Sequence, residues 1–487
     1  MVIGNWRLEI GDWLLCRIFT IRNLEQQIHP DIQYLSPMPI YPDAVSYAHR
    51  WLDIIAKPSL TQAEGEAIVE ETLYNFANHF NRGFLEYRKS VTEAGMFAAT
   101  EWTGRGAVMQ DAFGREWIDC LGGYGLLSLG WSHPRVVEAV RAQLSRTPMP
   151  SQELLDPLRG VLARLLAMIT PGDIGYFFFA AGGTEAVEGA MKLAKMYTRK
   201  AGFITSLRGF HGKTMGSLSL LGKSDFRAPA LPLYPYVQWV PFGDADAVER
   251  QLQIADAVGQ DIAAVVMEPI QGEAGAIVPP DDFWPRLRQL CDRYGVLLIA
   301  DEVQTGLGRT GKLWGVDHWE VVPDIITMGK ALGGGVMPVS CFGAREEIWG
   351  VMMEPNPFVH TTTTGGNPLA CAAAIAAITV TLEEDLPRQA AEKGAYFKAG
   401  LEKLAANYPM IYDRISGRGL LLGQHFRDAE VGYSVAAGLF KRGVVVAGTL
   451  TNARTVRIEP PLVIEYEQID AVLERLDDTL REVRAGL

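Results

Sequence analysis

The sequence predicts an α/β protein whose central sheet is mostly parallel and flanked by helices. Three short apolar runs, residues 263–268, 295–301 and 324–330, are bounded by glycine, proline or charge, which is typical of buried parallel strands. Between the second run and the first, residues 281–295 have the pattern of a crossover helix. Because strands and helices alternate in this way from about residue 125 to about residue 380, we expect one large domain there.

The elements on either side of this region predict a smaller α+β domain. A capping-box pattern at residues 61–64 opens a helix that closes at Gly83. The apolar face expected for this helix consists of Ile68, Val69, Leu73, Phe76 and Phe80. Residues 106–110 and 116–120 flank a turn at 111–114 and predict a hairpin. The chain ends in a helix whose apolar stripe is Ile469, Leu473, Leu476, Leu480 and Val483.

Four segments follow from this pattern. Residues 1–64 are expected to be an N-terminal extension, and its residues 1–37 show no clear periodicity. Residues 65–124 would form the N-terminal part of the small domain, and residues 125–380 the large domain. Residues 381–487, with more charged helices and a smaller sheet, would complete the small domain, which is therefore built from both chain ends.

Composition narrows the class of protein. The formal net charge of -12 argues against nucleic acid or an anionic membrane as the main partner, because both bind basic surfaces. The apolar stretch at residues 13–21 is interrupted by Arg17 and is far shorter than the roughly 18 residues that a membrane helix needs. The five cysteines are scattered and predict reduced cytoplasmic thiols, and the histidines form no metal-ligand cluster.

Charged residues close each of the three apolar runs. Glu268, Asp301 and Lys330 should therefore lie at the carboxyl ends of strands, where open α/β sheets bind ligands. Each position alone is more often a solvent-facing strand end. The glycines at 333–335 and 306–311 leave the backbone free of side chains, which would admit a planar ligand. A lysine and an aspartate there suit pyridoxal phosphate, since the amine forms a Schiff base and the carboxylate keeps the ring nitrogen protonated.

Weaker signals agree with this chemistry. Gly183 and Thr184 follow a strand-like run and open a helix, which alone is an ordinary turn but beside such a lysine becomes a phosphate site. Phe210 offers a ring that stacks on a cofactor or belongs to the core. Val303 would face the other side of that ring, and Gln304 is placed to bond its phenolic oxygen.

Six segments together resemble the class III aminotransferases, of fold type I. They are residues 183–185, 210–212, 268–275, 301–311, 329–335 and 365–368. Residues 83–90, 151–159, 360–363 and 446–462 are most similar to the bacterial members that act on putrescine. The resemblance runs from about residue 65 to the end. It implies transfer of a terminal amino group from a diamine, putrescine or cadaverine, to a 2-oxo acid such as 2-oxoglutarate.

The resemblance also implies roles for individual residues. Lys330 and Asp301 would be catalytic. The cofactor would further contact Gly183, Thr184, Phe210, His211, Glu268, Val303 and Gln304, and Thr363 would reach the phosphate of the neighbouring subunit, so a homodimer or a dimer of dimers is implied. Glu273 and Arg457 would form a switchable pair, in which the arginine binds a keto-acid carboxylate when released and is covered when an amine is bound.

Two positions depart from the family pattern. Gly182 stands where relatives have serine, and the missing hydroxyl removes about 1–2 kcal/mol of phosphate binding if nothing replaces it. Thr364 stands where an aromatic residue is common. Both bear on cofactor affinity rather than on reaction type.

Other functions remain open at this stage. An ω-amino acid, ornithine or acetylornithine aminotransferase differs from a diamine enzyme in a few pocket side chains. An aminomutase on the same scaffold would release no free keto-acid product. A cofactor-binding regulator would need a basic DNA-binding segment, which the sequence does not show, and an inactive paralogue would fail to bind the cofactor productively.

Overall fold

The computed structural model describes residues 41–86 and 100–486 and divides the chain into two units, Met1–Thr61 and Gln62–Leu487. In the first unit the described residues form helix α2 (Pro42–Ile55), which begins at a proline whose fixed φ suits the first helical turn. Residues 1–37, expected to lack periodicity, lie outside the described residues. None of the described helices is both long enough and apolar enough to cross a membrane.

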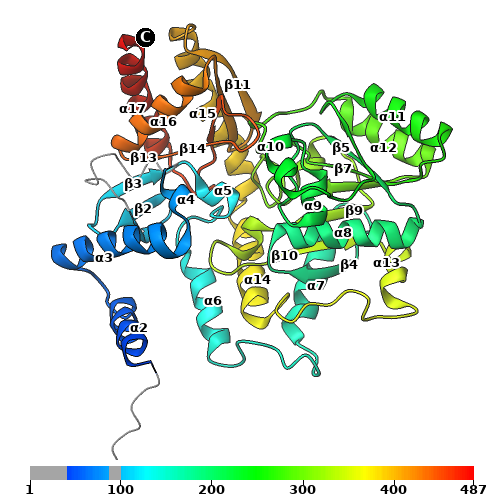
Figure 1. Ribbon diagram of the computed structural model, residues 1–487, viewed down its shortest axis with the longest axis horizontal. Helices are drawn as coiled ribbons and strands as arrows, with labels where there is room; N and C mark the ends of the chain where they lie inside the picture. Colours follow the sequence, from blue (N-terminus) through cyan, green and yellow to red (C-terminus); the bar gives the residue numbers. More distant parts are fainter. Residues whose placement is uncertain (1–40, 87–99, 487) are drawn as a thin grey trace, which may run out of the picture. The chain divides into compact units, whose positions relative to one another are not determined.

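The second unit is built around a seven-stranded sheet (Figure 1). In spatial order its strands are β4 (Tyr176–Ala180), β10 (Ser340–Ala344), β9 (Ile325–Met328), β8 (Leu297–Asp301), β7 (Ile262–Met267), β5 (Gly202–Ser206) and β6 (Val237–Val240). Strand β10 is antiparallel to both of its neighbours, and the remaining pairs are parallel. The three apolar runs of the sequence are β7, β8 and β9, so the prediction of a mostly parallel sheet is confirmed.

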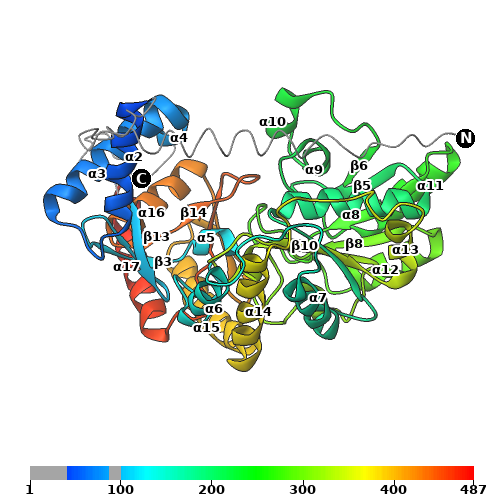
Figure 2. The same cartoon turned by 90° about the horizontal axis from the view of Figure 1, so that it is seen from below.

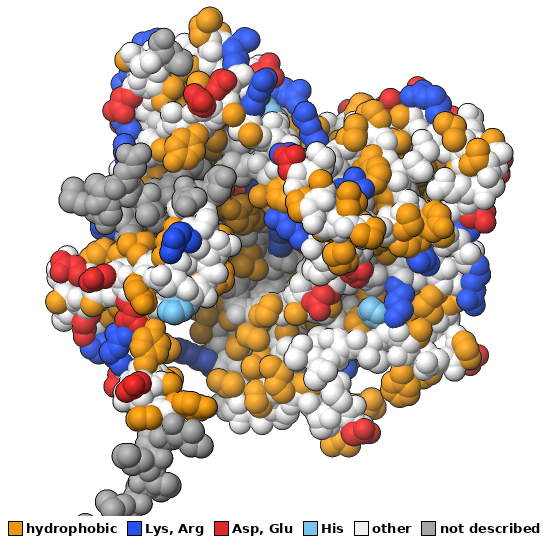
Figure 3. All heavy atoms as spheres, in the orientation of Figure 1, with side chains coloured by type: hydrophobic (Ala, Val, Ile, Leu, Met, Phe, Trp, Pro, Cys, Tyr) orange, Lys and Arg blue, Asp and Glu red, His pale blue; other side chains and the backbone are white. Residues whose placement is uncertain are grey.

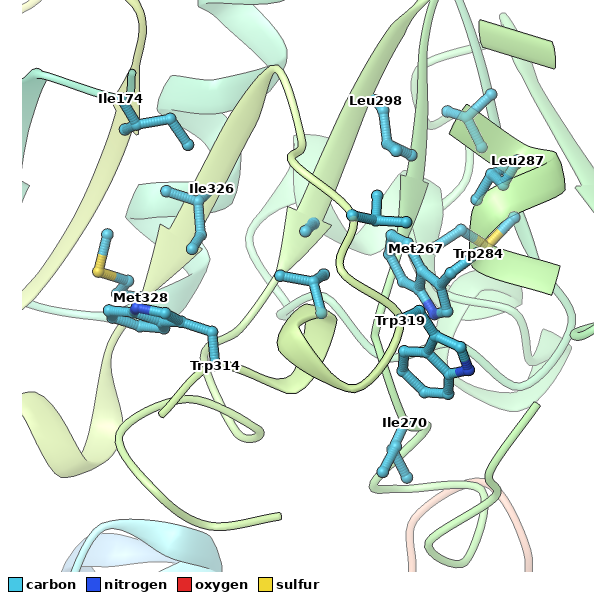
Figure 4. Packing of buried hydrophobic residues seen from close by; sticks show 14 of the residues in the cluster. Ile174, Met267, Ile270, Trp284, Leu287, Leu298, Trp314, Trp319, Ile326 and Met328 are labelled. Atoms are coloured by element: carbon cyan, nitrogen blue, oxygen red, sulfur yellow. The ribbon is translucent and has the colours of Figure 1, made fainter. Parts of the chain in front are cut away.

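Helices cover both faces of this sheet (Figure 2). One face packs against α7 (Pro157–Ile169), α11 (Ala245–Ala257), α12 (Phe283–Tyr294) and α14 (Pro368–Glu383). The other face packs against α8 (Gly183–Thr198) and α13 (Glu346–Met353). Successive strand residues alternate between the two cores, as Leu298 and Ile299 do. In the first core, Trp284 stacks on Trp319 with ring centroids 6.2 Å apart (Figure 4).

Shorter helical segments connect these elements. They are α5 (Gly122–Gly125), α6 (Pro134–Leu144), α9 (Met215–Leu220), α10 (Ser224–Arg227), η2 (Ala228–Ala230), η3 (Gly315–His318) and η4 (Lys330–Gly333). The cysteines within the described ranges, Cys120, Cys291, Cys341 and Cys371, are free and buried, as the scattered spacing predicts.

Segments from both ends of the second unit share a further core. This core contains two four-stranded sheets. The first consists of β1 (Glu101–Arg105), β2 (Val108–Asp111), β3 (Glu116–Asp119) and β13 (Val444–Val445). The second consists of β11 (Tyr412–Arg418), β12 (Leu421–Phe426), β15 (Thr455–Ile458) and β14 (Ala447–Gly448). Helices α15 (Leu386–Asn407), α16 (Ala429–Lys441) and α17 (Tyr466–Ala485) pack on this core. The predicted hairpin is β2 and β3, and β13 pairs in parallel with β3. Segments from both ends of the second unit therefore share one core, while the domain division at 64, 124 and 380 stays a prediction.

The prediction for Phe80 is wrong. Helix α3 (Gln62–Asn75) buries Ile68 and Val69 as expected, but it continues into a π-helical turn (Phe76–Phe80) before α4 (Arg82–Glu86). Phe80 still lies on the side of Phe76, since their ring centroids are 4.8 Å apart, but at this end of the helix the apolar face is solvent-exposed, and Phe80 is 69% exposed.

Replacing a helical glycine with alanine should have opposite effects on the free energy of unfolding at two positions. A Cβ on Gly189 in α8 would collide with the buried ring of Phe342, so Gly189→Ala should lower the free energy of unfolding by about 1–3 kcal/mol. Gly160 in α7 is exposed and an added Cβ would meet nothing within 4 Å, so Gly160→Ala should raise it by about 0.5–1 kcal/mol. Urea unfolding of both variants measures these two changes in the free energy of unfolding. Equal effects would contradict the tight packing of α8 on β10.

Candidate active site

Glu268, Asp301 and Lys330 lie at one edge of the seven-stranded sheet. Glu268 directly follows β7, Asp301 ends β8, and Lys330 comes two residues after β9. Because these three strands are parallel neighbours, their carboxyl ends meet at the same edge, with Asp301 opposite Thr327. This is the edge where open α/β sheets bind ligands. In the view of Figure 3 the molecular surface is hollowed near the middle, and lysine or arginine side chains are visible inside the hollow.

Three groups hold the Asp301 carboxylate in one orientation. Its Oδ2 lies 2.7 Å from His211 Nδ1, and its Oδ1 accepts hydrogen bonds from Thr327 Oγ1 at 2.9 Å and from Val303 N at 3.1 Å. The other ring nitrogen of His211 lies 3.2 Å from Thr205 Oγ1. Burial alone would lower the pKa of His211, but the hydrogen bond and charge of Asp301 raise this pKa overall. The aspartate is thus a buried side chain held in one orientation beside a histidine of raised pKa.

Glu268 supports the loop that carries Phe210. Its two carboxylate oxygens accept hydrogen bonds from Phe210 N at 2.9 Å and from Gly272 N at 3.0 Å. Burial raises the pKa of Glu268 to about 7, against the lowering effect of His211 and of these two amides. The carboxylate therefore fixes the backbone around the half-buried Phe210.

Lys330 occupies an unusual backbone conformation at the first position of η4. Its φ of 45° lies in the left-handed region, which side chains other than glycine seldom adopt and which is common at ligand-binding sites. Burial lowers the pKa of the Lys330 amine, although Glu459 and Glu273 act in the opposite direction. A lowered pKa favours the neutral amine, the form that reacts with carbonyl groups.

Hydroxyl groups line the start of α8. Gly183 is its first residue, and a Cβ there would lie 2.7 Å from Val303 Cγ1, so only glycine lets the helix begin this close to the Asp301 loop. Thr184 Oγ1 lies 2.7 Å from Thr214 Oγ1 and 2.6 Å from Ser217 Oγ. Helix amides and hydroxyl groups of this kind bind phosphate. Thr214 and Ser217 were not identified from the sequence.

Glu185 compensates in part for the unusual loop before this helix. Its Oε2 accepts hydrogen bonds from Gly182 N at 2.7 Å and from Ala181 N at 3.1 Å. The backbone at the serine-to-glycine departure is therefore held by a neighbouring carboxylate, and Thr214 and Ser217 supply hydroxyl groups nearby.

Gln304 is buried and directed toward a second carboxylate. Its Nε2 donates to Tyr124 O at 3.2 Å and lies 3.1 Å from each carboxylate oxygen of Glu459. The contact of Gln304 with a cofactor oxygen stays a prediction.

Glu273 covers Arg457, as the resemblance implies. Arg457 Nη1 donates to Glu273 Oε1 at 2.9 Å, and the arginine side chain is 1% exposed. Burial alone would lower the pKa of Arg457, but Glu459 and Glu273 raise it overall, so the guanidinium is held charged. Leu450 N donates to Glu273 Oε2 at 2.9 Å, and the Arg457 guanidinium lies 5.3 Å from the centre of the Tyr124 ring. Arg457 Nη2 is buried and has no hydrogen-bond partner among the described residues.

Glu459 is a further site residue that sequence reasoning missed. Its Oε2 lies 3.0 Å from Arg457 Nε. The sequence spacing could have indicated this residue. Side chains two residues apart on a strand face the same side, and Glu459 follows Arg457 at this spacing directly after β15.

Thr363 forms a hydrogen bond with a residue outside the group described above. It is exposed in the chain between α13 and α14, and its carbonyl accepts a hydrogen bond from Gln152 Nε2 at 2.5 Å. Its predicted contact, the phosphate bound by a neighbouring subunit, stays a prediction.

The expectation that the glycines after Lys330 and Asp301 open the backbone to a ligand is wrong at several positions. Gly335 has a φ of 73°, and a Cβ there would lie 2.7 Å from Leu127 Cδ2. A Cβ on Gly306 would lie 2.9 Å from the ring of Trp314. These glycines are required by turns and by packing within the protein.

Comparisons with known proteins agree with this geometry. The family model for class III aminotransferases matches residues 90–480. The putrescine aminotransferase of Pectobacterium atrosepticum is 48% identical over 458 residues, covering 93% of this chain and 96% of that protein. The ornithine aminotransferase of Toxoplasma gondii ME49 superposes with a TM-score of 0.77 at 31% identity, covering 88% of this chain and 100% of the other. An amine transaminase from an uncultivated Pseudomonas species, solved with pyridoxal phosphate bound, has a TM-score of 0.73 at 29% identity, covering 79% and 95%.

Proposed function

Because the chain belongs to the class III aminotransferases, we propose that it transfers a terminal amino group from a diamine to a 2-oxo acid. Putrescine is the first candidate donor and cadaverine the second, with 2-oxoglutarate as the acceptor. The observation that carries this proposal is the 48% identity over 93% of the chain with a putrescine aminotransferase. The ion pair that covers Arg457 supports it, since an amine donor without a carboxylate requires that arginine to be covered.

Aminotransferases of this class use pyridoxal phosphate, which supplies an aldehyde that captures amines and a ring that takes up electrons from the neighbouring carbon. The residues of this chain fit such a group. Asp301 is a fixed buried carboxylate for a protonated ring nitrogen, Lys330 is an amine of lowered pKa, and the start of α8 offers hydroxyl groups and amides to a phosphate. Phe210 and Val303 would face the two sides of the ring.

Lys330 and Asp301 act on different protons in the proposed reaction. In its neutral form Lys330 can remove a proton from the carbon that bears the donor's amino group and later return one. Asp301 would keep a proton on the ring nitrogen of the bound cofactor, and His211 holds the Asp301 carboxylate in place. Glu268 acts on the cofactor site indirectly, since its carboxylate accepts a hydrogen bond from Phe210 N and so fixes the backbone of Phe210.

Glu273 and Arg457 distinguish the two substrates. While Glu273 remains on Arg457, the pocket presents no free cation to an amine donor. When Glu273 moves away, Arg457 can bind the carboxylate of a 2-oxo acid, and its unpartnered Nη2 adds a second donor for a bidentate contact. The active assembly in this proposal is a homodimer or a dimer of dimers, in which Thr363 reaches the phosphate bound by the partner subunit.

A donor panel tests this function. The full chain loaded with pyridoxal phosphate should form glutamate from 2-oxoglutarate and putrescine, with cadaverine, ornithine and β-alanine as competing donors. Ornithine is included because a solved ornithine aminotransferase is 31% identical. Absence of glutamate with either diamine, together with turnover of ornithine or β-alanine, would reject the diamine assignment. Product formation without any acceptor would indicate an aminomutase.

A further inference from the structure

Glu459 is a fully buried carboxylate to which the mechanism above gives no role. Its position is fixed by the backbone, because Glu459 N donates to Cys120 O at 2.8 Å. Its oxygens contact Arg457 Nε at 3.0 Å and Gln304 Nε2 at 3.1 Å, and Arg309 Nε lies 3.9 Å away. A buried charge of this kind is costly unless neighbouring charges compensate it.

The four buried charges at this end of the pocket alternate in sign. Arg309 is followed by Glu459, then by Arg457, and then by Glu273. The first member is anchored to the protein, since Arg309 donates to the carbonyls of Leu420 and Pro460. The last member is anchored by the Leu450 amide described above. Two arginines and two carboxylates sum to zero, so these four charges balance one another.

The chain of charges borders the strand ends that carry the site, because Gln304, three residues after Asp301, lies 3.1 Å from both oxygens of Glu459. Glu459 and Glu273 both act to raise the pKa of Lys330, and Arg457 acts to lower it. A donor bound at Lys330 therefore experiences these charges as well. A diamine carries a second ammonium at its far end, and a monoamine of the same length does not.

We propose that Glu459 is a specificity-determining residue that keeps the Arg457 end of the pocket neutral and so admits amine donors with a second positive charge. The inference rests on the proposed function, because it places an amine donor at Lys330. Without the Glu459 carboxylate, Arg309 and Arg457 would leave a net positive charge that repels a distant ammonium in a poorly hydrated site. A purely structural role, holding β15 in place, would instead affect all amines alike.

The test compares putrescine with n-butylamine in wild type and Glu459→Gln, both loaded with pyridoxal phosphate. For each amine the half-saturating concentration is measured, as a substrate or as a competitive inhibitor. Glu459→Gln should raise this concentration for putrescine about tenfold relative to n-butylamine, with little change in kcat. The difference should shrink near pH 10, because the far ammonium then loses its proton. Glu459→Asp should restore part of the discrimination.

Glu467→Gln provides the matched control, since it removes the same charge at an exposed position of α17. It should leave the ratio between the two amines unchanged. An equal loss for both amines in Glu459→Gln, or a ratio that does not depend on pH, would overturn the inference. If wild type turns over neither amine, the proposed function fails, and the effect of Glu459 is still decided by the two amine dissociation constants from tryptophan fluorescence.

Discussion

Replacing Lys330 with alanine should lower kcat for amino transfer by about 10⁴-fold, the largest effect expected of any single substitution in this chain. The variant loses both the amine that captures the cofactor's aldehyde and the base that moves the substrate proton. Burial lowers the pKa of this amine, which favours the neutral form that both roles require. The measurement is kcat with putrescine and 2-oxoglutarate under saturating pyridoxal phosphate.

A chemical label separates this catalytic role from a structural one. Borohydride reduction of the loaded wild-type enzyme, followed by peptide mapping, should mark Lys330. Lys312→Ala serves as the control, because it removes an exposed lysine from the loop that follows Asp301 and should leave both labelling and kcat unchanged. Labelling at another lysine, or a Lys330→Ala enzyme within tenfold of wild type, would contradict the assignment.

The parts of this site that the sequence could predict are those with local signals. Asp301 and Lys330 each end a buried apolar run, and a strand end can be recognised from the residues on either side of it. The start of α8 was predictable for the same reason, since Gly183 comes three residues after the last residue of β4. Parallel strands then bring these local features to one edge without further information.

The remaining features depend on contacts between distant segments. His211 and Asp301 are separated by 90 residues, and Gln304 and Glu459 by 155, so neither hydrogen bond could be anticipated from spacing. Phe80 is exposed although it lies on the side of Phe76, because local periodicity does not show where along a helix the packing partners end. The glycines after Lys330 were read as open backbone, but only the tertiary structure shows that Leu127 fills the space beside Gly335.

Asp301→Asn should lower kcat by about 10³-fold, the second largest effect, while leaving the fold intact. An asparagine of nearly equal size can still accept hydrogen bonds from Thr327 and Val303, but it carries no charge to hold a proton at the cofactor's ring nitrogen. The same change removes the charge that raises the pKa of His211, so this pKa should fall toward the low value that burial alone would give. Stopped-flow kinetics and NMR titration of His211 measure the two effects.

Thr327→Val is the matched control for the orientation of Asp301. It removes one hydrogen bond to Oδ1 but keeps the carboxylate and its contact with His211, so the loss in kcat should be about tenfold. The order wild type, Thr327→Val, Asp301→Asn follows if the charge of Asp301 matters more than its exact orientation. If Asp301→Asn kept activity within about threefold of wild type while the His211 pKa fell, the carboxylate would serve the histidine rather than the cofactor.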